Sequence, residues 1–365
     1  MPTTGNALGG IGQAGRMRAS HPPVSPMKRP TLLLAHAASA AALLLGLATA
    51  DALAFDLQGH RGARGLAPEN TLAAFERALA VGVNTLELDV TLSAEGVPVV
   101  THDTTPNPDL TRDAQGQWLK ARGQAFWRQP LPSIQALDVG RINPATRYAR
   151  DFAAQEPRDG ERIPTLAAVF ERVKALGAKQ VRFNIETKIH PLKPEESPSP
   201  EALTRAVIEV IKAHGMAERT TLQSFDWRTL QVARHIAPEL PRSYLTAHLP
   251  RFDTVSSGDW TLGLKLADHD DVPAMVAAAG GRIWSPHFSN LTRAVIERAH
   301  DLELRVLPWT VNEPTDMERL VDWGVDGLIT DYPDRLRQVL AQRGQALPPV
   351  LPLPAATSRT ARAEP

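Results

Sequence analysis

Short β-type runs alternate with helix-type runs along most of this chain, from about residue 55 to residue 343. The β-type runs are 55–59, 84–92, 97–101, 181–187, 220–225, 242–247, 282–285, 304–310 and 326–330. The helix-type runs carry apolar residues at helical spacing, as in 165–176, where Thr165 can cap a segment whose apolar face includes Val169 and Val173. This alternation predicts an α/β protein with a parallel sheet, and its length favours closure into a TIM-type (β/α)8 barrel.

One of the nine β-type runs does not fit a barrel of eight parallel strands. Only 93–96 separates 84–92 from 97–101, and this link is too short for a parallel crossover. It suits a hairpin turn, so we expect 97–101 to fold back antiparallel on 84–92. The hairpin would bring His102 beside Glu87 and Asp89. It would also leave about 103–163 as an insertion at the C-terminal face, where barrel enzymes keep their active sites.

Charged residues alternate with apolar ones on two of the predicted strands. Glu87 and Asp89 share the inner face of 84–92, while Glu186 and Lys188 continue the inner face of 181–187. Carboxylates are costly inside a barrel, so three that converge from two strands indicate a bound cation, with a salt-bridged structural cluster as the alternative. Oxygen ligands in a chain without cysteine suit one hard divalent cation, Ca²⁺ or Mg²⁺. Such an ion would neutralise the carboxylates, which would otherwise repel an anionic substrate, and it would polarise a phosphoryl oxygen.

Two histidines are expected at the strand ends that carry these carboxylates. His60 ends the first strand and His102 ends the hairpin. Because an unperturbed histidine titrates near pH 6.5, one can act as a base while the other protonates a leaving alkoxide. Arg61 and Lys188 offer cationic partners for phosphate oxygens, although a surface ion pair is the alternative for Arg61.

A series of short motifs follows in order between about residues 58 and 340. They are His60-Arg61-Gly62-Ala63-Arg64-Gly65, Pro68-Glu69-Asn70-Thr71, Glu87-Leu88-Asp89, Val99-Val100-Thr101-His102-Asp103, Glu186-Thr187-Lys188, Gln223-Ser224-Phe225, Trp309-Thr310-Val311-Asn312 and 326–334. Together they make the chain resemble the glycerophosphodiester phosphodiesterase family over nearly all of 55–343.

The resemblance implies a phosphoric diester hydrolase that releases glycerol 3-phosphate and an alcohol from small-molecule glycerophosphodiesters. It implies that His60 and His102 form the acid–base pair and that Arg61 and Lys188 contact phosphate. It also implies that Glu87, Asp89 and Glu186 ligate the metal ion. Attack by the substrate's own glycerol hydroxyl, through a cyclic phosphate, and direct attack by water both remain open.

The segment after His102 does not predict which alcohol the substrate releases. After His102 the sequence departs from the Leu-x-Arg-Thr-Thr type of stretch found in many relatives, and the insertion carries Trp118, Phe126 and Trp127. We expect these three to pack the insertion onto the barrel, with an apolar wall for the leaving group as the alternative. Trp309 either lines a glycerol pocket or fills the barrel end.

Two rival functions follow from the same residues. A related barrel lipase would cleave lysophospholipids or intact phospholipids, and it would need an apolar rim, for which the insertion aromatics are the candidates. A binding protein for phosphodiesters would keep the fold without catalysis. Activity against micellar lysolipid but not soluble glycerophosphocholine would favour the first, and the complete set of histidines and carboxylates argues against the second.

The two ends of the chain are expected to lie outside the barrel. Residues 1–54 contain a basic stretch from Met27, an apolar run and the Ala52-Leu53-Ala54 triplet, which predict a cleavable signal peptide and a periplasmic or secreted protein. A retained membrane anchor is the alternative, but no stable membrane insertion is expected after cleavage. The Ala- and Pro-rich residues 344–365 are expected to form a disordered tail. Forty basic residues balance forty acidic ones, so no nucleic-acid partner is expected.

Overall fold

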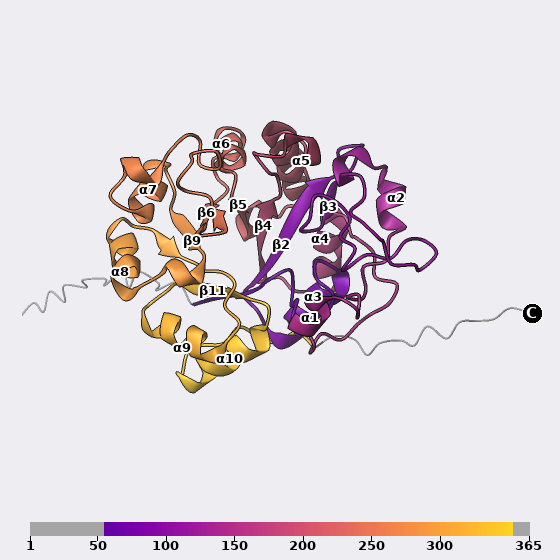
Figure 1. Cartoon of the computed structure of the whole chain (residues 1–365). Helices are drawn as coiled ribbons and strands as arrows, with labels where there is room; N and C mark the ends of the chain where they lie inside the picture. Colours follow the sequence, from indigo (N-terminus) through magenta and orange to yellow (C-terminus); the bar gives the residue numbers. More distant parts are fainter. Residues whose placement is uncertain (1–54, 353–365) are drawn as a thin grey trace, which may run out of the picture. The chain divides into compact units, whose positions relative to one another are not determined.

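The computed structural model describes residues 55–352, and in this part of the chain eight parallel strands form the predicted TIM-type barrel (Figure 1). The strands are β1 (Asp56–Gly59), β2 (Thr85–Leu92), β4 (Arg182–Thr187), β5 (Thr220–Ser224), β6 (Arg242–Thr246), β9 (Ile283–Pro286), β10 (Arg305–Val306) and β11 (Gly327–Thr330). They pair in the order β10-β9-β6-β5-β4-β2-β1-β11. The ring is closed by backbone hydrogen bonds from Asp326 N to Val306 O, 3.0 Å, and from Ile329 N to Pro308 O, 3.0 Å.

Helices cover the outside of the barrel and bury the outward side chains of the strands. They are α1 (Leu72–Val81), α4 (Leu166–Ala175), α5 (Pro200–Ala213), α6 (Trp227–Ile236), α7 (Val272–Ala278), α8 (Arg293–Asp301), α9 (Pro314–Asp322) and α10 (Pro333–Gln342). Leu86, Leu88 and Val90 of β2 are fully buried in this apolar layer. The alternation of the strand therefore turns Glu87 and Asp89 toward the barrel interior.

The predicted hairpin is present. β3 (Pro98–Val100) pairs antiparallel with β2, and Val90 lies opposite Val100. Thr101 N donates to Asp89 O at 2.9 Å, which carries the pairing to the residue before His102. The hairpin therefore delivers His102 to the end of the barrel where Glu87 and Asp89 lie.

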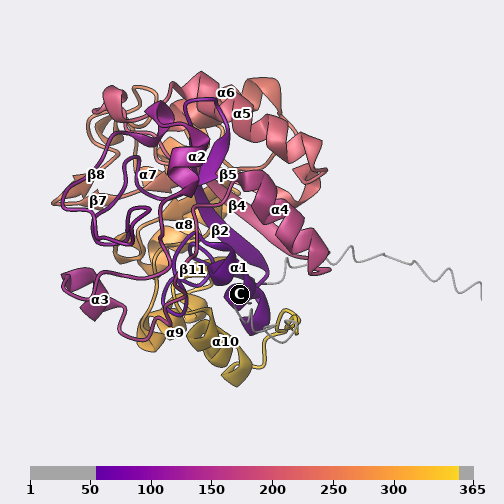
Figure 2. The same ribbon diagram turned by 90° about the vertical axis from the view of Figure 1, so that its right-hand side faces the viewer.

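The insertion between β3 and α4 contains two short helices, α2 (Leu131–Gln135) and α3 (Arg147–Asp151). A second excursion follows β6 and contains a small antiparallel hairpin, β7 (His248–Leu249) with β8 (Phe252–Asp253). In Figure 2, β7, β8 and α3 all lie at the left edge, on one side of the barrel. Five 3-10 helices complete the described elements: Phe126–Arg128, Pro194–Glu196, Ala217–Arg219, Leu266–Asp268 and Phe288–Asn290.

The predicted terminal segments lie largely outside the described residues. The signal peptide prediction falls wholly within 1–54. Of the predicted tail, the structure describes 344–352, where Leu351 N donates to Leu79 O at 3.0 Å and Arg337 Nη1 donates to Pro348 O at 2.6 Å. The first part of that tail therefore contacts α1 and α10. Within 55–352, no helix is both long and apolar enough to span a bilayer.

Candidate active site

A cavity of about 170 Å³ opens where the barrel strands end. We call it the central cavity. Its lining includes all but one of the site residues predicted from the sequence: His60, Arg61, Glu87, His102, Glu186, Lys188 and Trp309. The remaining one, Asp89, is 1 % exposed and forms part of a carboxylate cluster with Glu87 and Glu186. The topology therefore brings together residues from β1, β2, the β2–β3 hairpin, β4 and the segment after β10.

A tight turn after β1 aims His60 and Arg61 into the cavity. At Gly59 a Cβ atom would lie 2.0 Å from Gly62 O, so the turn requires glycine there. Arg61 itself has a left-handed φ of 50°, which is uncommon for a residue other than glycine. Its backbone N–H donates to Glu87 Oε2 at 2.8 Å. The sparsely populated conformation thus places a main-chain donor on the first carboxylate of the cluster.

Glu87, Asp89 and Glu186 form a buried carboxylate cluster. One oxygen from each lies within 4.8 Å of the others. Burial and the neighbouring Asp89 raise the pKa of Glu87, and burial raises the pKa of Glu186 to about 7 although Lys188 acts to lower it. Both shifts favour the protonated form of Glu87 and Glu186 when no cation is near.

The same cluster has the features of a cation site. Gln223 Nε2 donates to Glu87 Oε1 at 2.7 Å, and Asn70 Nδ2 donates to Asp89 Oδ2 at 2.9 Å, so these amides orient the two carboxylates. Asp89 Oδ1 is buried and accepts no hydrogen bond. Lys188 Nζ lies 3.6 Å from it. Three buried oxygen donors, one of them without a hydrogen bond, fit a hard divalent ion, so the cluster can hold a metal ion.

His60 is held by a buried ion network. Its Nδ1 lies 2.6 Å from Asp331 Oδ1, and its Nε2 lies on the cavity side, 3.9 Å from Glu87 Oε2. Arg64 donates to both oxygens of Asp331, at 2.7 and 2.8 Å, and Asn312 Nδ2 donates to Oδ2 at 2.7 Å. Burial lowers the pKa of His60 from 6.5 to about 4, although Asp331 acts to raise it. His60 is therefore neutral near pH 7, with a fixed ring orientation.

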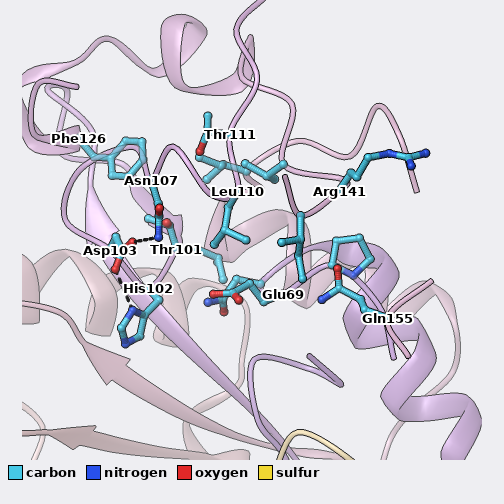
Figure 3. Close-up of a pocket in the computed structure, with 16 residues that line it drawn as sticks. Glu69, Thr101, His102, Asp103, Asn107, Leu110, Thr111, Phe126, Arg141 and Gln155 are labelled. Carbon is cyan, nitrogen blue, oxygen red and sulfur yellow. Dashed lines mark hydrogen bonds and ion pairs between the residues drawn. The ribbon is translucent and has the colours of Figure 1, made fainter. Parts of the chain in front are cut away.

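His102 has a smaller and more open support (Figure 3). Its Nδ1 lies 3.1 Å from Asp103 Oδ1, and Asn107 Nδ2 donates to the other oxygen of Asp103 at 2.7 Å. Burial, together with Arg61 and Lys188, lowers the pKa of His102. Both histidines therefore pair Nδ1 with an aspartate, and Nε2 is the ring nitrogen outside this pairing.

Arg61 is connected to the insertion by two successive hydrogen bonds, through Glu69 to Tyr148. Its Nη1 donates to Glu69 Oε1 at 2.6 Å, and Glu69 Oε2 accepts from the Tyr148 hydroxyl. The same hydroxyl accepts from Arg64 Nη1 at 3.1 Å, and Phe152 lies against the Arg64 guanidinium. Helix α3 of the insertion therefore helps to fix both arginines of the site.

The aromatic residues of the insertion have mixed surroundings. Phe126 is buried with Val99, Ile134 and Ile163, as the packing interpretation predicts. Trp118 lies against the Arg112 guanidinium, and Trp127 Nε1 donates to Glu195 O at 3.1 Å. None of the three lines the central cavity, so the structure gives no support to an apolar wall made by the insertion.

A second cavity of about 600 Å³ adjoins the first, and we call it the outer cavity. The two share His102, Glu186, Lys188, Phe225 and Trp309. Trp309 thus lines both cavities and is fixed by a 2.9 Å hydrogen bond from Nε1 to Ser285 O. The outer cavity adds aromatic residues from the excursion after β6, Phe252 and Trp260.

Sequence reasoning assigned no role to several residues at the site. They are Arg64, Glu69, Asn70, Asp103, Tyr148, Gln223, Phe225, Phe252, Trp260, Asn312 and Asp331. Asp331 and Asn312 could have been found, because each follows closely after a barrel strand or its extension, at the C-terminal face. Tyr148 and Phe252 lie in elements of only five and two residues, and Trp260 lies in a turn, so none of them belongs to a segment long enough to show periodicity.

Comparison with known proteins gives a consistent result. The family model "Glycerophosphoryl diester phosphodiesterase family" matches residues 60–335. A glycerophosphodiester phosphodiesterase of Caldanaerobacter subterraneus subsp. tengcongensis is 30 % identical over 290 residues, which cover 78 % of this chain and 97 % of the relative. Lysophospholipase D GDPD1 of Homo sapiens is 24 % identical, with 77 % of this chain and 84 % of the relative covered.

Solved structures share the fold. One from Silicibacter pomeroyi DSS-3, assigned as a glycerophosphoryl diester phosphodiesterase, has a TM-score of 0.73 and 38 % identity, covering 80 % of this chain and 95 % of the other. A phosphodiesterase of Oleispira antarctica, solved in complex with the product sn-glycerol-3-phosphate, has a TM-score of 0.59 and 24 % identity, covering 80 % and 99 %. At that lower identity the likeness concerns the fold.

Proposed function

Because this chain belongs to the glycerophosphoryl diester phosphodiesterase family, and is a phosphoric diester hydrolase, we propose that it uses a divalent metal ion and two histidines to release glycerol 3-phosphate from glycerophosphodiesters. The observation that carries the catalytic part is the position of His60 and His102 on one cavity that also contains Glu87 and Glu186. The sn-glycerol-3-phosphate bound to the Oleispira antarctica relative supports the identity of the product.

The carboxylate cluster supports the metal part of the proposal. Glu87, Asp89 and Glu186 would supply the oxygen ligands, and Asp89 Oδ1 has no hydrogen bond that a ligand would have to displace. A bound Ca²⁺ or Mg²⁺ supplies positive charge that polarises a phosphoryl oxygen. Gln223 and Asn70 hold the carboxylates in place through their amide groups.

His60 and His102 would move the protons. Asp331 and Asp103 each hold the Nδ1 proton of one ring, so that Nε2 faces the reacting groups. One ring, neutral and with Nε2 unprotonated, takes the proton of the attacking hydroxyl; the other enters the step as an imidazolium, protonated on both nitrogens, and gives its Nε2 proton to the departing alkoxide. The attacking hydroxyl is either water or the neighbouring glycerol hydroxyl, and both routes use the same pair.

Three cationic side chains and two aromatic ones would hold the substrate. Arg61, Arg64 and Lys188 line the central cavity and would bind the nonbridging phosphate oxygens. Phe225 and Trp309 lie edge to face, with ring centroids 5.2 Å apart, and would form an apolar wall for the glycerol carbons.

The experiment that tests this proposal is an assay for glycerol 3-phosphate release from glycerophosphocholine by the protein beginning at Phe55. It is run with chelator and after adding back Ca²⁺ or Mg²⁺. We expect metal-dependent release that His60→Ala and His102→Ala each reduce by at least about 10²-fold. His235→Ala, on the exposed face of α6, is the matched control. Release that survives chelation, or near-normal rates in either variant, would overturn the proposed mechanism.

A further inference from the structure

The outer cavity is larger than the phosphate chemistry requires. Its volume of about 600 Å³ exceeds that of the central cavity, about 170 Å³, and it falls within the roughly 300–1,000 Å³ typical of pockets that enclose drug-sized ligands. Because the two cavities share His102, Lys188, Phe225 and Trp309, a substrate bound by its phosphate in the first would extend directly into the second.

Aromatic rings form one wall of the outer cavity. Phe225 contacts Phe252 with ring centroids 5.2 Å apart, and it contacts Trp260 at 6.3 Å. Trp260 also contacts Phe252 at 6.1 Å and His190 at 4.8 Å. These rings meet edge to face or tilted, so they brace one another into a continuous surface. Phe252 and Trp260 belong to the excursion after β6 and not to the barrel, whose chemistry is complete without them.

The charged groups of the outer cavity compensate one another. Asp103 lies 3.4 Å from Arg122, and Glu196 lies 3.3 Å from Lys193. Glu186 accepts from Lys188 at 2.7 Å. Each of these carboxylates therefore has a cationic partner, so the outer cavity offers no uncompensated carboxylate.

The two loops that contribute to the outer cavity carry exposed apolar side chains. In the described part of the chain, four large apolar side chains are exposed: Leu192, 61 %; Phe252, 37 %; Leu262, 38 %; and Val350, 53 %. The first three lie in the two loops that supply His190, Lys193, Phe252 and Trp260 to the outer cavity. Exposed apolar side chains in the same loops as the aromatic wall indicate that an apolar ligand can approach from this side.

We propose that the outer cavity binds a hydrocarbon chain that is covalently part of the phosphodiester substrate. The chain is either an acyl chain on the glycerol, as in a lysophospholipid, or the alkyl chain of the departing alcohol, and either would lie on the same aromatic wall. The proposal rests on the proposed function, because it places the phosphodiester in the central cavity. It makes the excursion after β6 the segment that sets substrate range.

Two substrate series test the proposal, both used below the concentration at which micelles form. One is lysophosphatidylcholine with hexanoyl, octanoyl or decanoyl chains, and the other is glycerophosphate esterified to hexanol, octanol or decanol. Glycerophosphocholine is the reference. We expect kcat/KM to rise in one series by up to about fourfold per methylene until the cavity is filled. The series that rises identifies which end of the substrate carries the chain.

Variants locate the effect. Phe252→Ala, at a partly exposed position, should flatten the rise, and Trp260→Leu should do the same. The readout is the ratio of kcat/KM for the chain substrate to that for glycerophosphocholine within each protein, so a change in folded fraction cancels. Trp118→Ala removes an aromatic ring that lines neither cavity, and it should keep the wild-type ratio.

Direct binding separates the two proposals. The Kd values of hexyl, octyl and decyl phosphate, measured by calorimetry, should fall with chain length and depend on Phe252.

The outcomes distinguish the two proposals. If the protein hydrolyses glycerophosphocholine but neither kcat/KM nor Kd changes with chain length, the hydrocarbon site in the outer cavity is overturned while the proposed function stands. A rise that persists in both variants would also overturn it. If no substrate is hydrolysed, the proposed function fails, and the alkyl phosphates alone decide on the chain site.

Discussion

His60 and Asp331 lie 2.6 Å apart although 271 positions separate them in the chain. The carboxylate is fully buried and is also bound by Arg64 and Asn312. Closure of β1 against β11 therefore creates the partner that orients the histidine. His102, by contrast, depends on its sequence neighbour Asp103, which is partly exposed.

The Asp331 carboxylate should matter for turnover more than for substrate binding. In Asp331→Asn the amide can no longer hold the Nδ1 proton of His60 in the same way, so we expect kcat to fall by about 10²- to 10⁴-fold with a small change in KM. Steady-state kinetics with glycerophosphocholine measures this. Asp326→Asn, at the other end of β11, changes the carboxylate that contacts His300 and accepts from Val306 N, away from the cavity, and kcat should stay near wild type. An equal loss in both variants would contradict the assignment.

The Asp331 carboxylate should make the free energy of unfolding depend on pH in the acidic range. Burial alone would raise the pKa of Asp331, but Arg64 and His60 outweigh it and hold the pKa well below its ordinary 3.8. A lowered folded-state pKa stabilises the protein above about pH 4 and loses that contribution as pH falls further. We expect urea unfolding to show Asp331→Asn less stable than wild type by about 3 kcal/mol at pH 7, with the gap shrinking below pH 4. Parallel curves down to pH 3 would refute this.

Metal binding should be measurable without any substrate. At a metal concentration 100 times Kd, a single site stabilises the fold by about 2.7 kcal/mol, so Ca²⁺ or Mg²⁺ should raise Tm and chelator should reverse the change. Glu186→Gln removes one ligand of the cluster and should lose most of the shift. Glu318→Gln, on the outer helix α9, is the matched control and should keep it. A full shift in Glu186→Gln would place the ion elsewhere.

The Tyr148 hydroxyl should contribute to substrate binding although it lies outside both cavities. Tyr148→Phe removes the bond to Glu69 and the bond from Arg64, so both arginines lose a constraint. Hydrogen bonds to charged groups are worth about 1.5–3 kcal/mol, and we expect KM to rise about tenfold with a smaller effect on kcat. Tyr244→Phe, whose hydroxyl bonds Ala279 O on the outside of the barrel, should leave KM unchanged. Equal KM values for the two variants would show that the Tyr148 hydroxyl does not contribute to substrate binding.

Much of the barrel follows from local pattern. The period of two in 84–92 predicts the inward direction of Glu87 and Asp89, and the four-residue link 93–96 predicts the hairpin, because loop length selects the pairing geometry. Both inferences concern residues close in sequence, and the structure contains both features. The grouping of Glu186 with them follows because neighbouring parallel strands end at the same face.

Features that depend on packing between distant segments cannot be predicted from local pattern. The β7–β8 hairpin has strands of two residues, which are too short to show an alternation of apolar and polar residues. The sequence therefore does not predict that Phe252 and Trp260 line a cavity next to the site. Likewise, the residues around Tyr148 give no sign that its hydroxyl contacts Glu69, because that contact depends on how the whole insertion folds over the barrel.

Because the turn at 93–96 is short, one part of the site can form earlier during folding than the rest. Glu87, Asp89 and His102 come together when a short loop closes, which costs little chain entropy and is fast. Glu186 is added across the 103–163 insertion, and Asp331 reaches His60 only when the last strand joins the first. A partly folded chain would thus hold two of three ligands and one of two oriented histidines. Metal affinity and hydrolysis should therefore recover as successive signals during refolding, each reporting a different closure of the ring.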